Sequence, residues 1–221
     1  MATVFNPTLK EIALAAVNQK VILQGVSWDF YERVLAEYSG SNALHFAYDN
    51  GTLEVEVPLF EHERPTRILQ DVVTNICFEL GLEFINAGST TFRKRAKAKG
   101  CEPDTAFYIQ HEPQMRGASQ LDLRHDPPPD LVIEVDVTSP SLNKLPIYAA
   151  LGVPEIWLYR GVGVTFHRLA GNAYEEITHS LALPALDSQT ATDFLRQGLN
   201  ESSSAWFRSV RAWATARRKQ P

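Results

Sequence analysis

The sequence predicts an α/β or α+β domain in which a mixed β-sheet is flanked by helices. Two stretches, 27–38 and 61–80, carry apolar residues at helical spacing, and alternating residues on both sides of Asn50-Gly51 favour a hairpin between them. A run rich in Val and Ile, 131–137, is typical of a buried strand. The resulting order of helix, hairpin, helix, several strands, helix, strands and helices is that of a mixed sheet.

Length and composition indicate one domain with a sizeable core. The chain has 221 residues, of which 44% are hydrophobic. We therefore expect a single domain over 1–221, with a core at about 28–185 and a C-terminal helical extension at about 190–221. Two cysteines do not suggest a disulfide framework or a cysteine zinc site, so we expect a reducing, cytoplasmic location. We expect no membrane span, because no apolar run approaches about 20 residues.

The net charge limits how the chain could meet a nucleic acid. It is −5 at pH 7, with a pI of about 5.7. A protein that binds nucleic acid mainly by neutralising phosphates is usually basic. Any such contact here must be local, or a metal ion must supply positive charge.

The N-terminal third is predicted to hold a helix and a hairpin. Ser27 is a plausible N-cap for a helix over 27–38. The runs 44–48 and 52–57 alternate around Asn50-Gly51, a pair that favours a tight hairpin turn.

A second helix is expected from Glu61 to about residue 80. Pro65 suits its first turn, and the acids Glu61 and Glu63 suit the positive end of the helix dipole. Gly81 ends the helix. Its apolar stripe consists of Ile68, Leu69, Val72, Val73, Ile76 and Leu80.

The next segment is predicted to be extended. Residues 82–87 and 90–95 read as strands around Gly88-Ser89, and 100–109 as a further strand with acids at its start. A compact basic run lies at 93–99. Residues 111–126 are polar and loop-like.

The strand over 131–137 has two different faces. Prolines at 127–129 stop any preceding element, and side chains in a strand alternate between its faces. One face carries Asp130, Val132, Glu134 and Asp136, and the other is apolar. The acidic face is either a solvated surface or a site. The remaining expected elements are a helix at 140–151, strands at 155–159, 164–169 and 174–177, and helices at 190–199 and 205–218.

Two acids on separate strands, Asp104 and Glu134, could form a metal site. A Mg²⁺ ion takes oxygen ligands at about 2.1 Å, commonly one or two carboxylates with waters and substrate phosphate. Neighbouring strands lie about 4.8 Å apart, whereas Asp130 and Glu134 are about 13 Å apart along one strand. Asp104 is therefore the best partner for Glu134. Lys144, on the following helix, lies within reach to stabilise charge on a phosphate or to orient a water.

These residues resemble a known pattern. Pro103-Asp104, Glu134-Val-Asp136 and Lys144 are similar to the PD-(D/E)XK restriction-endonuclease-like superfamily and, more narrowly, to the Uma-two (Uma2) family of endonuclease-like proteins. The likeness spans about 28–200. It is carried by Glu61-His62-Glu63, Gly88-Ser89-Thr90, Glu102-Pro103-Asp104, the stretch 127–148 and Gly152-Val-Pro-Glu155-Ile-Trp157.

The resemblance implies a restriction-endonuclease-like core, a mixed β-sheet flanked by helices, with an N-terminal helix and hairpin and C-terminal helices added. It implies Mg²⁺- or Mn²⁺-dependent cleavage of nucleic-acid phosphodiesters, with DNA as the expected substrate. The metal ligands would be Asp104, Glu134 and the backbone carbonyl of Val135. An acid of the first core helix, Glu61 or Glu63, would assist.

The chain departs from the superfamily at its lysine. That lysine would follow the glutamate by two residues, where this chain has Asp136. Lys144 resembles a migrated lysine on the next helix, although a solvated helix lysine is the alternative reading. Asp136 is a secondary candidate, either supporting the site or forming a turn.

Several alternatives stay open at this point. Arg93, Lys94 and Arg95 would contact a phosphate backbone or form a solvated face. The main rival function is a catalytically inactive nuclease-fold protein that binds nucleic acid or a protein partner; another metal-dependent hydrolase is a third reading. A homodimer is expected only by analogy, because cutting two strands benefits from two sites.

Overall fold

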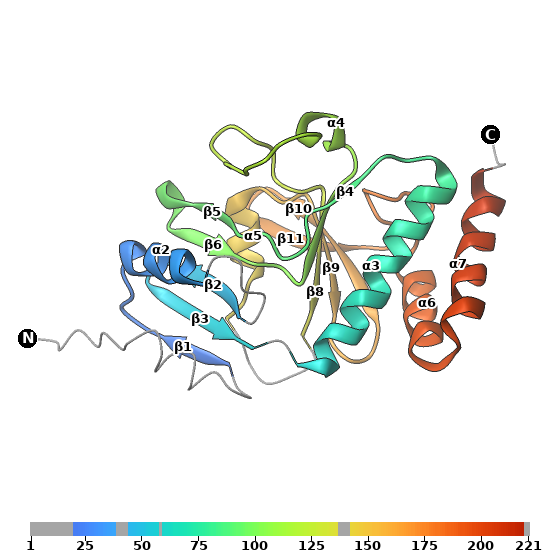
Figure 1. The fold of residues 1–221 in the computed structure, drawn as a ribbon, viewed down its shortest axis with the longest axis horizontal. Helices are drawn as coiled ribbons and strands as arrows, with labels where there is room; N and C mark the ends of the chain where they lie inside the picture. Colours follow the sequence, from blue (N-terminus) through green and yellow to red (C-terminus); the bar gives the residue numbers. More distant parts are fainter. Residues whose placement is uncertain (1–19, 39–43, 58, 137–141, 219–221) are drawn as a thin grey trace, which may run out of the picture.

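A computed structural model describes residues 20–38, 44–57, 59–136 and 142–218. It contains two β-sheets with helices between and outside them (Figure 1). The first sheet lies toward the N-terminal end of the molecule, and the helices that close the chain lie at the opposite end.

The first sheet is antiparallel and has the order β1-β3-β2-β6-β5. Its strands are β1 (Val21–Leu23), β2 (His45–Asp49), β3 (Thr52–Glu56), β5 (Phe92–Lys94) and β6 (Lys99–Cys101). The predicted hairpin is confirmed: β2 pairs with β3, and both turn residues, Asn50 and Gly51, have positive φ. Helix α2 (Trp28–Glu37) covers this sheet and begins at Ser27, whose side chain accepts the Phe30 N–H as predicted for an N-cap.

The second sheet is mixed and has the order β11-β10-β9-β8-β7-β4. Its strands are β4 (Ile85–Asn86), β7 (Thr105–Tyr108), β8 (Leu131–Val135), β9 (Glu155–Tyr159), β10 (Val164–Ala170) and β11 (Ala173–Ile177). Among the described strands only β8 and β9 pair in parallel, and helix α5 (Leu145–Leu151) lies between them in the chain. The α/β character with a mixed sheet is therefore confirmed.

Both faces of β8 are buried, so its acidic face is not a solvated surface. Ile133 and Val135 pack on the side of the long helix α3 (Phe60–Leu80). Val132, on the other face, packs with Ile147 and Leu151 of α5, and with residues of the first sheet. Helix α5 thus lies between the two sheets, and Glu134 faces this inter-sheet space.

Helix α3 forms the centre of the other layer. It packs against β8, α6 (Ser188–Asn200) and α7 (Ser203–Arg218), the two closing helices that were predicted (Figure 1). Its predicted apolar stripe is buried except for Leu80, which is partly buried, and Gly81 ends the helix in a left-handed conformation. Pro65 lies one turn inside the helix rather than in its first turn, because the helix begins at Phe60. None of the described helices is long and apolar enough to cross a membrane.

Two expectations about secondary structure were wrong, and a third is confirmed only in part. The strands expected at 82–87 and 90–95 form over Ile85–Asn86 and Phe92–Lys94 alone, and they lie in different sheets. The strand expected at 100–109 is two strands, β6 and β7, in different sheets. Pro103 separates them, since proline has no N–H to continue a ladder. In the segment 111–126, expected to be a loop, a short helix α4 (Glu112–Met115) forms. The start of the helix expected at 140–151 lies partly outside the described residues, and α5 itself begins at Leu145.

Candidate active site

Asp104 lies where the chain passes from the first sheet to the second, directly before β7. Strands β7 and β8 are antiparallel with Thr105 opposite Ile133. Extending this register by one residue places Asp104 opposite Glu134. The Asp104 Oδ2 atom accepts a hydrogen bond from the Val135 N–H at 2.6 Å. The structure therefore brings together the two acids that the sequence paired.

Helix α5 supplies two further side chains to Glu134. Lys144, directly before the helix, donates from Nζ to Glu134 Oε2 at 2.8 Å. Tyr148 donates its hydroxyl to Glu134 Oε1 and accepts from the buried Cys101 thiol at 3.2 Å. Lys144 is mostly buried and is not a solvated helix lysine. Each carboxylate oxygen has two lone pairs, so Glu134 keeps the capacity for another ligand.

Burial and neighbouring charges shift the pKa values of Glu134 and Asp104 in opposite directions. Burial raises the pKa of Glu134 to about 7; the charge of Asp104 adds to this rise and that of Lys144 opposes it. Burial also opposes ionisation of Asp104, but hydrogen bonds from His45 and Val135 and the charge of Lys144 leave its pKa lowered. For Lys144 burial favours the neutral amine, yet Glu134 and the other surrounding acidic groups hold its pKa well above the usual range. Lys144 is thus an ammonium ion at neutral pH.

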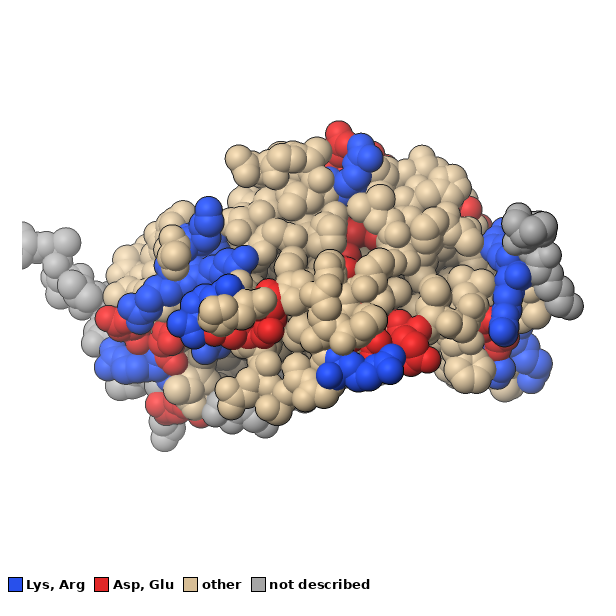
Figure 2. Space-filling model, turned by 90° about the horizontal axis from the view of Figure 1, so that it is seen from above, with Lys and Arg blue, Asp and Glu red and all other residues tan. Residues whose placement is uncertain are grey.

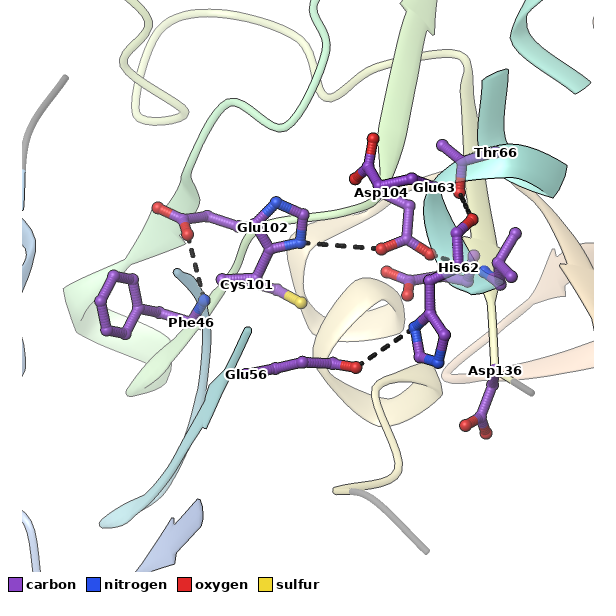
Figure 3. A network of polar contacts seen from close by, with 12 residues as sticks. Phe46, Glu56, His62, Glu63, Thr66, Cys101, Glu102, Asp104 and Asp136 are labelled. Carbon is purple, nitrogen blue, oxygen red and sulfur yellow. Dashed lines mark hydrogen bonds and ion pairs between the residues drawn. The ribbon is translucent and has the colours of Figure 1, made fainter. Parts of the chain in front are cut away.

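A second group of polar residues surrounds Asp104 on the side of the first sheet (Figure 3). His45 Nδ1 lies 3.7 Å from Asp104 Oδ1, and this contact outweighs burial and raises the pKa of the imidazole. Glu102 accepts hydrogen bonds from the Phe46 N–H at 3.0 Å and from the Thr91 hydroxyl. Glu102 therefore ties β2 and the segment before β5 to the strand start that holds Asp104.

The two acids of α3 occupy different environments. Glu61 is exposed to solvent. Glu63 lines a polar cavity of about 520 Å³ together with Asp104 and His45, and forms an ion pair with Arg67 at 3.2 Å. Figure 3 shows Asp104 beside this helix. Of the two acids between which the sequence could not choose, Glu63 is the one that shares a cavity with Asp104.

A smaller cavity of about 240 Å³ opens on the other side of the pair. Glu134, Lys144 and Asp136 line it, and the Val135 backbone also borders it. Asp136 lies 3.6 Å from Lys20 Nζ and 3.8 Å from Arg160 Nε, each measured from a carboxylate oxygen. Asp136 thus supports the rim of this cavity through two cations.

Other described acids have structural partners. Asp130 accepts from the Ile109 and His111 N–H groups at 2.7 and 2.9 Å, so it binds the segment that follows β7. His62 Nδ1 lies 3.3 Å from Glu56 Oε1, so this buried histidine links α3 to β3.

The predicted basic residues lie at the edge of the first sheet. Arg93 Nε is 3.0 Å from Glu32, and an Arg95 guanidinium nitrogen is 2.6 Å from Asp29. Lys94 Nζ donates to the Leu151 carbonyl at 3.4 Å. None of these three residues is in direct contact with the acid pair. The segment from Gly88 to Thr91 connects them along the chain to the polar cavity that Asp104 lines.

Sequence reasoning missed three members of this network. Tyr148 is a buried core residue whose hydroxyl also reaches Glu134. Its spacing of four residues from Lys144 places both on one helix face, and that signal could have found it. His45 and Glu102 carried no such signal, because strand pairing brings His45 toward Asp104 from 59 residues away.

The donor set fits a hard divalent cation. Among the residues that the structure describes, no group of three or more His, Cys, Asp or Glu side chains is arranged to hold a metal. Two mostly buried carboxylates opposite one another nevertheless match the few protein ligands that Mg²⁺ usually takes, the rest being water and substrate. Among the contacts of the described residues, that of Asp104 Oδ1 is the 3.7 Å approach of His45, so this oxygen is able to accept a ligand.

Comparison with known proteins identifies the family. Residues 28–204 match the family model Uma2, described as "Putative restriction endonuclease", and the match covers most of the chain. A search of curated proteins found no match. The chain therefore belongs to the Uma2 family, and its fold is that of the restriction-endonuclease-like proteins.

Proposed function

We propose that this Uma2 protein is a divalent-metal-dependent endonuclease that hydrolyses phosphodiester bonds of nucleic acid, with DNA as the expected substrate. The observation that supports the proposal is that Asp104, Glu134 and Lys144 lie close together in the fold. Forty residues of sequence separate the first from the last, yet the carboxylates are neighbours across β7 and β8 and the ammonium is 2.8 Å from Glu134.

Asp104, Glu134 and the Val135 carbonyl would hold Mg²⁺ or Mn²⁺. When bound, such an ion lowers the pKa of a coordinated water and adds positive charge beside a phosphate. Contacts within the chain already hold both carboxylates in position. The Val135 N–H and His45 fix the Asp104 carboxylate, and two donors from α5 fix that of Glu134.

Lys144 is the cation that the chain itself supplies. Its ammonium is held in the charged form by the surrounding acids and lies in a largely water-excluded site. There it would orient the attacking water or stabilise negative charge that develops on the phosphate. Glu63 lines the cavity beside Asp104 and would hold solvent for the reaction on that side.

The test is cleavage of supercoiled plasmid and single-stranded DNA with Mg²⁺ or Mn²⁺, beside EDTA. Wild type is compared with Glu134→Gln and with Glu175→Gln, a matched change in an exposed acid that pairs with Arg168 on β10 and β11. Support would be metal-dependent cutting that Glu134→Gln loses and Glu175→Gln keeps. Cutting that survives Glu134→Gln would overturn the assigned site. No cutting at all would favour the nuclease-fold binding module.

A further inference from the structure

A third cavity, about 420 Å³ in volume, lies at the edge of the first sheet, between α2, β5 and the segment 120–124. We call it the basic groove, because four of its lining residues are Arg93, Lys94, Arg95 and Arg124. Figure 2 shows Lys and Arg side chains gathered at the end of the molecule where α2, β5 and β6 lie. This concentration stands out in a chain with a net charge of −5.

We propose that the basic groove binds the sugar-phosphate backbone of the nucleic-acid substrate beyond the bond to be cut. The proposal rests on the function proposed above and names a binding site for the same substrate. It assigns to Arg124 and to the Arg93–Arg95 segment one role, neutralising phosphates, in a place separate from the acid pair.

The groove is joined to the acid pair by one short segment. Thr90 lines the cavity that contains Asp104, and the next residue, Thr91, lines the basic groove. The Thr91 hydroxyl donates to Glu102, two residues before Asp104. From Thr91 to Arg95 an extended chain covers about 13 Å. That length corresponds to the rise of about four nucleotides in one strand of B-form DNA. A strand that follows this segment would therefore run from the acid pair into the groove.

The acid partners of these arginines do not prevent phosphate binding. Arg93 pairs with Glu32, Arg95 with Asp29, and an Arg124 guanidinium nitrogen lies 2.5 Å from Asp122. All of these side chains are more than a third exposed. Exposed ion pairs of this kind contribute about 0–1 kcal/mol. A phosphate, which carries a full charge and several acceptor oxygens, can replace a carboxylate there, and Arg can then bind it with two hydrogen bonds.

The balance of charge also favours an anion. Four cations line the groove against Glu32 and Asp122, and Asp29 adds a third acid beside it. Four minus three leaves an excess of one positive charge.

The experiment measures binding without cutting. A fluorescein-labelled DNA duplex and its separated strand are titrated with full-length protein in EDTA, by fluorescence anisotropy, between about 50 and 200 mM salt. Wild type is compared with the double variant Arg93→Gln/Arg95→Gln. The control is Arg208→Gln/Arg211→Gln on α7, at the opposite end of the molecule. Both double variants change the net charge from −5 to −7.

If each groove arginine neutralises one phosphate, the groove variant lowers the slope of log K against log salt by about 1.8, because each phosphate contact contributes about 0.9. The α7 variant leaves the slope unchanged. Asp29→Asn/Glu32→Gln should tighten binding more than Asp193→Asn/Glu201→Gln, a matched change on α6 and directly after it, since only the first pair frees groove arginines. If wild type binds DNA and the groove and α7 variants show equal slopes, the basic groove is not a phosphate-binding site. That result would not contradict the proposed nuclease function. Wild type that neither binds nor cuts DNA would overturn both.

Discussion

Because Glu134 is buried, we expect the stability of the protein to depend on pH, and this can be tested without measuring catalysis. Its pKa in the folded protein is about 7, against an ordinary value of 4.5. The folded state therefore binds this proton more tightly than the unfolded state. Stability from this group is greatest below pH 4.5, falls as the pH rises to about 7, and is constant above that. The difference between 7 and 4.5, at about 1.4 kcal/mol for each pH unit, corresponds to about 3 kcal/mol.

Glu134→Gln removes this titration and keeps the shape of the side chain. We expect the free energy of unfolding of wild type to fall by about 3 kcal/mol more than that of Glu134→Gln between about pH 4.5 and 8. Urea unfolding followed by circular dichroism, at several pH values in EDTA, measures both. Adding Mn²⁺ at pH 8 should restore stability to wild type alone, because a cation favours the ionised carboxylate. Parallel pH profiles for the two proteins would refute the reasoning.

Three other substitutions test separate parts of the structure. Gly100→Ala would place a Cβ 2.9 Å from the buried ring of Tyr31, so it should destabilise by about 1–3 kcal/mol in urea unfolding; an unchanged midpoint would contradict this packing. Tyr148→Phe removes a donor to Glu134, so it should cost about 1–3 kcal/mol and weaken Mn²⁺ binding measured by calorimetry; unchanged affinity would exclude a positioning role. Asp136→Asn should keep most of the cleavage rate, because its contacts are with Lys20 and Arg160 at the cavity rim; complete loss would move Asp136 into the centre of the site.

Local signals in the sequence were sufficient where a single element decides the structure. The Asn50-Gly51 turn, the Ser27 cap and the stripe of α3 follow from neighbouring residues alone. The pairing of Asp104 with Glu134 was also predictable, since it needs only two adjacent strands.

Sequence reasoning failed where contacts between distant segments decide the structure. Whether the chain stays in one sheet after Gly88 or Pro103 depends on which strand edge is free, and no local pattern reports that. The approach of His45 to Asp104 follows from the same sheet change. The basic run at 93–99 was visible, but its distance from the acid pair and its acid partners on α2 were not.

The central claim is that Asp104 and Glu134 form one metal site that cuts nucleic acid. The most direct test measures Mn²⁺ binding by electron paramagnetic resonance, and DNA cleavage on the same samples. The proteins are wild type, Asp104→Asn, Glu134→Gln and the double variant. One shared site requires that each single variant lose both binding and cleavage, and that the double variant be no worse than either. Single variants that keep tight Mn²⁺ binding and cutting, or losses that multiply independently in the double variant, would contradict the claim.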